Sequence, residues 1–483
     1  MTGRRTFLEA AVGLGAAATL FPRVSGAERP AGAKKILQAS GLQVLEGDRP
    51  VRLRGVNLGG WMLIEDYMIG LPWTEWKIRE QFRRVLGAAA ADAFFGAWAE
   101  SYVTDSDLAF LARQGFSFAR LPFNYRQFES DLAPGQWREE GFRLLERAVA
   151  LCRAHGLWVL LDLHAAAGAQ ARDQNAGSAH GETYFWQQRA FMERTTALWV
   201  EIARRYRDDP AVLGYNLIGE PVTSDVGLLN DFYLSTIRAI RAVDPAHLIV
   251  LDANLWAKDV SSLQDRLFED PQVVPALHHY YFDDAFFERL TQYPGTLDGR
   301  VCDRRALERT LDGKHDQRRI RRTVIAAEFG VARSRRQLFS VQLAITRDLV
   351  SIFEEKGWGW ALWCYKDLRD MGLLTPRVDT PWRRFVDTAP VVDFLAKYDA
   401  LERPFSDAVD ALLKGSDVDP DTRKQWAREV RRDFDAPALD FVLKRLKGRS
   451  PDELGAMARS FAFESCEVHE DQLGMLTPFL GKV

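Results

Sequence analysis

The sequence predicts a (β/α)8 barrel followed by a small C-terminal helical extension. At 483 residues the chain is long enough for one large barrel and an appendage. Between about residues 50 and 395, short apolar segments alternate with amphipathic helical patterns, and eight such segments can be counted. Eight alternating units are what a closed parallel barrel requires. After about residue 395 the pattern changes to charged helices.

The eight strand-like segments are short, rich in β-branched residues and bounded by turn-forming residues. They are residues 51–57, 116–121, 157–163, 212–219, 247–252, 273–279, 323–328 and 358–364. Side chains alternate between the two faces of a strand, so Gly359 and Ala361 share a face with Trp363. We therefore expect Trp363 to lie over the barrel axis. By the same alternation, Val324 and Ala326 are expected below Glu328.

Two helix starts carry specific signals. Thr104 and Asp107 form a capping pair before an apolar run, and Gly115 is a natural stop. Ser450 and Glu453 form a capping box with a proline between them. The second signal belongs to the extension, which we place at residues 399–483, after a barrel domain at residues 28–398.

The first 27 residues are predicted to be a twin-arginine signal peptide. Gly3-Arg4-Arg5 precedes an apolar run that ends near Phe21, and small residues stand before a cleavage point after Ala27. The alternative is a membrane anchor, but the run is short for a bilayer. We expect a bacterial protein exported to the periplasm or the exterior.

The composition of the chain limits the kinds of partner that we expect it to bind. A formal net charge of −3 and a pI near 6.3 are not those of a nucleic-acid-binding protein. No other stretch reaches eighteen apolar residues, so we expect no stable membrane insertion. The four cysteines have no metal-type spacing and are expected to be free thiols, with one disulfide as the alternative.

Two glutamates end two of the predicted strands. Glu220 follows Leu-Ile-Gly and precedes Pro221, and Glu328 ends Val-Ile-Ala-Ala and precedes Phe-Gly330. A carboxylate at the carboxyl end of a buried strand is costly unless a site requires it. Paired carboxylates are what hydrolysis of glycosidic bonds uses. The alternative for either residue is a salt bridge at a strand end.

The chain resembles the family 5 glycoside hydrolases over residues 50–395, especially their exo-β-1,3-glucanase and β-glucanase branch. Arg54-Gly-Val-Asn-Leu-Gly-Gly-Trp61 and Asp162-Leu-His-Ala-Ala-Ala-Gly-Ala-Gln170 carry the resemblance together with the two glutamate segments. It implies that Glu220 is the acid–base and Glu328 the nucleophile of a retaining β-glycosidase. No metal or cofactor is implied. The nucleophile must be ionised and its partner protonated, so their pKa values should be pushed apart.

The resemblance also implies a set of supporting residues. Arg120 would hydrogen-bond the nucleophile, His164 would line the sugar subsite, and Trp363 would be the platform beneath the sugar. In Leu277-His-His-Tyr-Tyr281 the family's His-x-Tyr pattern fits two registers. We favour His279 with Tyr281 over His278 with Tyr280. Asn57 and Trp61 are lesser candidates for subsite walls.

One position departs from the family. The residue before the acid–base is normally an asparagine that binds the sugar 2-hydroxyl, and here it is Gly219. Replacing Gly219 by asparagine would be expected to restore this hydrogen bond and raise kcat.

The predicted function is hydrolysis of a β-1,3- or β-1,4-linked glucan, with an oligo- or polysaccharide as the partner. The alternatives are a mannan- or glycolipid-hydrolysing enzyme and a catalytically weak carbohydrate-binding barrel.

Overall fold

The computed structural model describes residues 34–314, 320–418 and 420–481. The predicted signal peptide lies outside these residues. Lys35–Val483 forms one compact unit.

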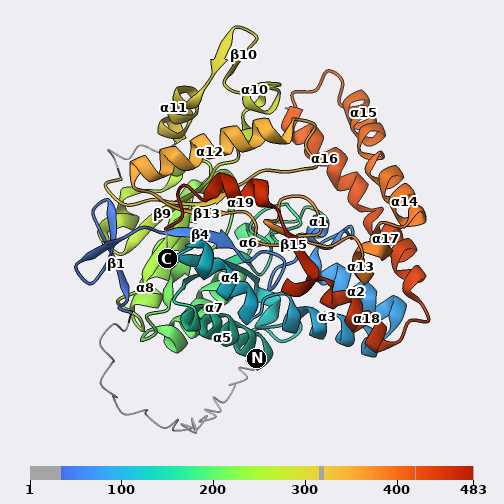
Figure 1. The fold of residues 1–483 in the computed structure, drawn as a ribbon, viewed down its shortest axis with the longest axis horizontal. Coiled ribbons are helices and arrows are strands. Elements are labelled where there is room, and N and C mark those ends of the chain that lie inside the picture. The colour runs from blue at the N-terminus through green and yellow to red at the C-terminus, as the bar shows by residue number, and fades with distance from the viewer. Residues whose placement is uncertain (1–33, 315–319, 419, 482–483) are drawn as a thin grey trace, which may run out of the picture. The chain divides into compact units, whose positions relative to one another are not determined.

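A closed barrel of eight parallel strands forms the centre of this unit (Figure 1). It closes in the order β12-β13-β4-β5-β6-β7-β8-β9, and the predicted barrel is confirmed. The strands are β4 (Arg54–Asn57), β5 (Phe118–Asn124), β6 (Trp158–Ala165), β7 (Val212–Asn216), β8 (Leu248–Asp252), β9 (Val273–His278), β12 (Ile325–Phe329) and β13 (Gly359–Leu362).

Helices surround the strands and place their apolar faces against them. The longer ones are α2 (Glu75–Leu86), α3 (Ala88–Ser101), α4 (Asp105–Gln114), α5 (Glu139–Ala154), α7 (Arg189–Tyr206), α8 (Val226–Arg241), α11 (Arg304–Lys314) and α12 (Phe339–Lys356). The short ones are α1 (Asp66–Ile69), α6 (Tyr184–Gln187), α9 (Asn254–Ala257), α10 (Ala285–Glu288) and α13 (Pro381–Val386). Helix α4 has the predicted Thr104–Asp107 capping box and ends at Gly115, whose φ is 89°.

One end of the barrel is filled with apolar side chains. Phe118, Leu160, Leu248 and Ala361 lie in this interior cluster. A small antiparallel sheet of β1 (Leu37–Ser40), β2 (Gln43–Glu46) and β3 (Arg49–Val51) packs against the same cluster through Leu37 and its neighbours. The apolar filling and this sheet close the amino-terminal end, so the carboxyl ends of the strands are left for a site.

Strand β12 does not follow simple alternation, whereas strand β13 does. Ile325 and Ala327 belong to the interior cluster, whereas Val324 and Ala326 pack among the outer residues, contrary to the prediction. The pairing of β12 with β9 shifts register between Ala326 and Glu328, so consecutive residues Ala327 and Glu328 both face inward. In β13 the prediction is confirmed, because Ala361 faces inward while Trp360 and Leu362 face the helices.

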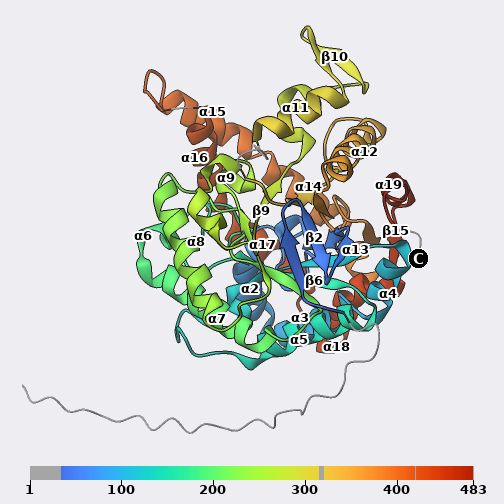
Figure 2. The ribbon, with the colours of Figure 1, turned by 90° about the vertical axis from the view of Figure 1, so that its left-hand side faces the viewer.

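The residues after 398 are helical, as predicted. Helix α14 (Ala389–Asp399) leads into this part of the chain. It is followed by α15 (Glu402–Leu412), α16 (Pro420–Arg432), α17 (Asp435–Leu443), α18 (Pro451–Ala458) and α19 (Glu470–Leu476). Helix α18 begins with the predicted Ser450–Glu453 capping box. Figures 1 and 2 show α17 beside α2 and α18 beside α3, and both pairs are in contact. Strand β15 (Cys466–Val468) also pairs with β14 (Leu374–Pro376), which follows the barrel.

We predict that a chain truncated after Asp399 does not fold to a stable barrel. Leu439, Leu443, Leu454 and Phe461 of the extension are fully buried. Each contributes about 1.5–3 kcal/mol, and a typical domain has only about 5–15 kcal/mol in total. Thermal unfolding of residues 34–399 should therefore show a large loss of melting temperature or no cooperative transition. Residues 34–483 are the control, and equal melting temperatures for the two chains would contradict the prediction.

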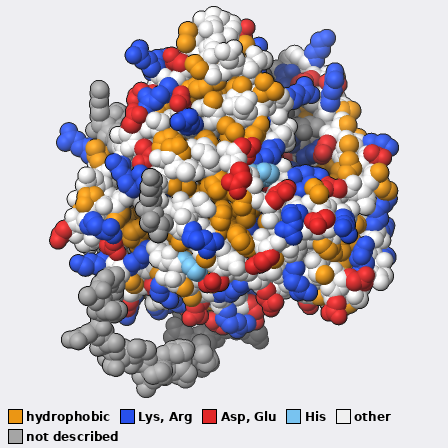
Figure 3. Space-filling model, in the orientation of Figure 1, with side chains coloured by type: hydrophobic (Ala, Val, Ile, Leu, Met, Phe, Trp, Pro, Cys, Tyr) orange, Lys and Arg blue, Asp and Glu red, His pale blue; other side chains and the backbone are white. Residues whose placement is uncertain are grey.

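All four cysteines are free thiols, as expected. No helix among the described residues is long and apolar enough to cross a membrane. On the face drawn in Figure 3, acidic and basic side chains of the described residues lie interspersed, in keeping with the small net charge.

Candidate active site

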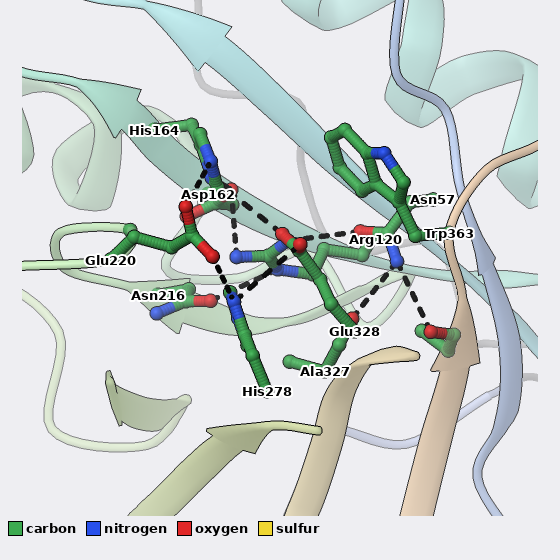
Figure 4. Close-up of polar contacts among 12 residues, drawn as sticks. Asn57, Arg120, Asp162, His164, Asn216, Glu220, His278, Ala327, Glu328 and Trp363 are labelled. Carbon is green, nitrogen blue, oxygen red and sulfur yellow. Dashed lines mark hydrogen bonds and ion pairs between the residues drawn. The ribbon is translucent and has the colours of Figure 1, made fainter. Parts of the chain in front are cut away.

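A layer of polar side chains lies at the carboxyl ends of the strands (Figure 4). Seven of the eight strands contribute one member each to this layer, and every member has an exposed fraction of at most 3%. The members are Asn57, Arg120, Asp162, Asn216, Asp252, His278 and Glu328. Buried polar groups need partners, and this layer satisfies them mainly among its own members.

Arg120 lies at the centre of the layer. Its guanidinium forms ion pairs with Glu328 at 2.6 Å and with Asp162 at 2.9 Å. It also donates to Asn57 Oδ1 at 2.9 Å and to Asn216 Oδ1 at 3.1 Å. The neighbouring carboxylates raise the pKa of Arg120 although burial lowers it, so the side chain is a permanent cation beneath Glu328.

Asn57 supports Arg120 instead of lining a sugar site. Its side chain is fully buried and its Nδ2 donates to the carbonyl oxygens of Ala327, Ala361 and Leu362. Trp61 is also buried and donates its indole N–H to the Ala99 carbonyl oxygen. The prediction of both residues as subsite walls is therefore wrong, because neither side chain has surface left for a ligand.

The carboxylate of Glu328 accepts hydrogen bonds from two side chains. Besides Arg120, the Tyr280 hydroxyl donates to its Oε2 at 3.0 Å. Charge-assisted hydrogen bonds of this kind favour the ionised carboxylate.

Glu220 is not on its strand but in a bend four residues beyond Asn216, where β7 ends. Its φ is 49°, an unusual value for a residue with a side chain. Asp252 holds this backbone by accepting a hydrogen bond from the Glu220 N–H at 3.0 Å. The bend turns the carboxylate toward His278, whose Nδ1 lies 2.9 Å from Oε1.

The favoured register of the His-His-Tyr-Tyr segment is wrong. His278 contacts Glu220 and Tyr280 contacts Glu328, whereas His279 points to Lys314, with its Nδ1 3.0 Å from Nζ. The Tyr281 hydroxyl is buried and has no hydrogen-bond partner among the residues that the structure describes. The alternation along β9 decides the register, because His278 is the last residue of the strand and the inward position belongs to it.

His164 and Trp363 lie on one side of the two glutamates. The two rings are stacked, with centroids 5.9 Å apart and planes inclined by 25°. His164 Nδ1 contacts Asp162 at 2.9 Å, and Trp363 donates its indole N–H to the Tyr67 hydroxyl at 2.7 Å. Both predicted residues thus lie at the site, with ring positions fixed by their partners.

The two catalytic candidates lie close together. Carboxylate oxygens of Glu220 and Glu328 and a ring nitrogen of His278 all lie within 4.8 Å of one another. This separation is near the ~5 Å typical of glycosidases that retain anomeric configuration, and well below the ~6.5–9.5 Å of inverting enzymes. The same three residues are also the group of described residues that could hold a metal ion.

Comparison with known proteins shows the family of the chain. Residues 81–368 match the cellulase family, glycosyl hydrolase family 5. The chain belongs to this family. A beta-xylosidase from Phanerodontia chrysosporium is 30% identical over 465 residues, covering 90% of this chain and 96% of the relative.

Other relatives match a smaller part of the family 5 chain. A probable glucan 1,3-beta-glucosidase A from Emericella nidulans is 29% identical over 48% of this chain and 57% of its own length. The crystal structure of an endoglucanase from Thermotoga maritima shares the fold. It has a TM-score of 0.50 and 19% identity, and covers 66% of this chain and 91% of its own.

In this family 5 enzyme the pKa values of the two glutamates are shifted in the directions opposite to the expected ones. Burial raises the pKa of Glu220, but the hydrogen bond and charge of His278 lower it further, to about 2. Burial raises the pKa of Glu328 against the charges of His278 and Arg120. The pKa of His278 is raised by nearby Glu328 and Asp252, although burial opposes this. His278 Nδ1 lies 2.9 Å from Glu220 Oε1, so this contact is a path along which a proton can pass between the two groups.

Several residues of the site were missed by the sequence reasoning. Asp252 ends the strand at 248–252, which is the same signal that marked Glu220. Glu65 follows the first strand, and burial together with nearby Glu328 raises the pKa of its carboxyl well above the ordinary value. Asn175 donates its amide to Glu220 Oε2 at 2.9 Å from a loop, where nothing in the local pattern marks it.

The structure also overturns the expectation for Gly219. A Cβ atom added to Gly219 would lie 2.4 Å from His164 Nδ1 and 2.9 Å from its Cγ. His164 cannot move aside easily, because it is held between Asp162 and Trp363. The space that an asparagine side chain would need is therefore filled by this ring.

We predict that Gly219→Asn lowers kcat/KM on every β-glycoside that the enzyme hydrolyses. Overpacking typically costs about 1–3 kcal/mol, which corresponds to roughly a tenfold to hundredfold loss here. Steady-state kinetics test this, with Gly96→Asn as a control, since a Cβ at Gly96 meets nothing within 4 Å. A rise in kcat in Gly219→Asn would contradict the steric account.

Proposed function

We propose that this family 5 enzyme is a retaining β-glycosidase that works by double displacement. The observation that carries the proposal is the placement of Glu220 and Glu328 with carboxylate oxygens within 4.8 Å, each beside different donors. Glu328 has the fixed positive charge of Arg120, which suits a nucleophile that must be ionised. Glu220 has the titratable ring of His278 beside it, with Nδ1 2.9 Å from Oε1, which suits a group that must gain and lose a proton.

In the first step, a carboxylate oxygen of Glu328 attacks the anomeric carbon. The bond from this carbon to the leaving-group oxygen breaks, and Glu220 transfers its proton to that oxygen. The product is a glycosyl ester on Glu328 and an ionised Glu220. Trp363 is the proposed platform for the sugar ring during this step, with His164 beside it.

In the second step, Glu220 takes a proton from water while the water oxygen attacks the anomeric carbon. The ester bond breaks and Glu328 leaves as a carboxylate, again stabilised by Arg120 and Tyr280. Two displacements at one carbon return the original configuration.

The proposed substrate is a β-glucoside from a β-1,3- or β-1,4-linked glucan. Similarity to a probable glucan 1,3-beta-glucosidase and to an Endoglucanase C from Acetivibrio thermocellus supports this choice. A β-xyloside is the second candidate, supported by the beta-xylosidase that is 30% identical over 90% of this chain. The two sugars differ only in the hydroxymethyl group on carbon 5.

A substrate panel separates these candidates. Aryl β-D-glucoside, β-D-xyloside and β-D-mannoside should be compared by kcat/KM, followed by product profiles on laminarin, cellulose and xylan oligosaccharides. We expect the glucoside to be preferred. Preference for the xyloside would change the proposed substrate but leave the proposed mechanism intact. If none of the three aryl glycosides is hydrolysed, both the proposed substrate and the proposed mechanism are contradicted.

Export through the twin-arginine pathway is also proposed, on the basis of Arg4, Arg5 and the apolar run after them. Expression of the full chain with and without Arg4→Lys/Arg5→Lys, followed by fractionation, tests it.

A further inference from the structure

The loop between β6 and α6 brings a side-chain amide to the proposed acid–base. Asn175 Nδ2 donates to Glu220 Oε2 at 2.9 Å and lies 3.5 Å from His164 Nε2. The orientation of the amide is determined, because turning Oδ1 toward a carboxylate oxygen would place two acceptors against each other. Asn175 and His278 therefore contact the two different oxygens of Glu220.

No residue next to Glu220 in the sequence could supply this donor. Gly219 has no side chain, and the His164 ring excludes any Cβ at that position. On the other side, Pro221 has no side-chain donor. The amide that reaches Glu220 comes from 45 residues earlier in the chain.

The loop that carries Asn175 is held on both sides by the barrel. The Thr74 hydroxyl donates to the Gln174 carbonyl oxygen at 2.8 Å, and the Trp76 indole N–H donates to the Gly177 carbonyl oxygen at 3.0 Å. These bonds fix the backbone one residue before and two residues after Asn175.

The C-terminal helices hold the same loop. Gln174 Nε2 donates to Asp435 Oδ2 at 3.0 Å, and Arg432 donates to the Arg172 carbonyl oxygen at 2.7 Å. Arg172 in turn forms an ion pair with Glu429 at 2.7 Å. A donor whose supporting backbone is fixed loses little entropy when it binds, so it can orient its partner effectively.

We propose that Asn175 is a positioning residue for Glu220, fixing the orientation of its carboxyl group and stabilising the carboxylate that forms when the proton leaves. This inference rests on the proposed function and specifies how its acid–base is controlled. In the first displacement the O–H bond of Glu220 breaks as a new O–H bond forms on the leaving group. The Asn175 hydrogen bond becomes charge-assisted at that moment, so it lowers the barrier to proton transfer.

The effect of replacing Asn175 should depend on the leaving group of the substrate. In Asn175→Ala, glycosides with poor leaving groups need a proton and should lose about tenfold to hundredfold in kcat/KM. A 2,4-dinitrophenyl glycoside needs no proton for its departure, so its kcat/KM should change less than about threefold. A hydrogen bond to a carboxylate lowers its pKa, and its removal should move the basic limb of the kcat/KM profile to higher pH. Asn175→Asp adds a negative charge beside Glu220 and should move this limb further in the same direction.

The experiment compares wild type, both Asn175 variants and a His180→Ala control on the two classes of glycoside across pH. His180 is an exposed residue of the same loop whose ring packs edge-on against Trp73, and its variant should behave as wild type. Equal losses on both substrates, with an unmoved basic limb, would show a merely structural role and overturn the inference. Unchanged kinetics in Asn175→Ala would overturn it as well. Failure of the wild type itself to hydrolyse either glycoside would instead refute the proposed function, and the inference with it.

Discussion

Replacing Glu328 by glutamine is expected to abolish turnover of every substrate, by about 10⁴-fold or more in kcat. An amide cannot form the glycosyl ester, and it gives no negative charge to stabilise the developing positive charge on the sugar. The fold should survive, because Arg120 keeps its ion pair with Asp162 at 2.9 Å. Steady-state kinetics and thermal unfolding of the same preparation measure both effects.

Glu129→Gln is the matched control for losing a buried carboxylate. Glu129 is also buried and paired with an arginine, with Arg194 Nε at 2.9 Å, but it lies outside the polar layer. It should lower the melting temperature while leaving kcat within about threefold of wild type. If Glu328→Gln retained a substantial part of the wild-type rate, Glu328 could not be the nucleophile.

Replacing Glu220 by alanine should reduce kcat/KM for poor leaving groups by about 10²–10⁴-fold. Activated aryl glycosides should still form the glycosyl ester, because their departure needs no proton. The ester would then accumulate, since no base activates water in the second step. A rapid burst followed by slow turnover is the expected time course.

Azide tests the same variant chemically. A small anion can enter the space left by the carboxylate and attack the glycosyl ester without a base, so it should restore turnover and yield a glycosyl azide. Chemical rescue of this kind should be absent in Glu328→Gln, which forms no ester. Failure of azide to accelerate the Glu220→Ala variant would argue against Glu220 as the acid–base.

The barrel could be predicted because its pattern is local. Each strand carries its own apolar run and each helix its own caps, as at Thr104 and Ser450, so errors in one element do not spread to the others. Local patterns also predicted that Glu220 and Glu328 lie at one end of the barrel. Each follows a strand segment, and the carboxyl ends of all barrel strands meet at that end.

The predictions that were wrong concern how the strands end and how they pair with their neighbours. The pattern His-His-Tyr-Tyr fits two registers equally, and only the alternation along β9 selects His278. The register shift in β12 turns Ala327 and Glu328 to the same side, which alternation cannot anticipate. Asn175 belongs to a loop that is fixed by contacts with distant residues such as Asp435. No pattern in the sequence around Asn175 therefore predicts its position.

Retention of anomeric configuration requires Glu328 as a nucleophile and Glu220 as its acid–base. Proton NMR of the first sugar released from an aryl β-glycoside, recorded before mutarotation, tests it most directly. The β-anomer should appear first, with the α-anomer growing in later. Initial release of the α-anomer would mean a single displacement by water and would contradict the mechanism.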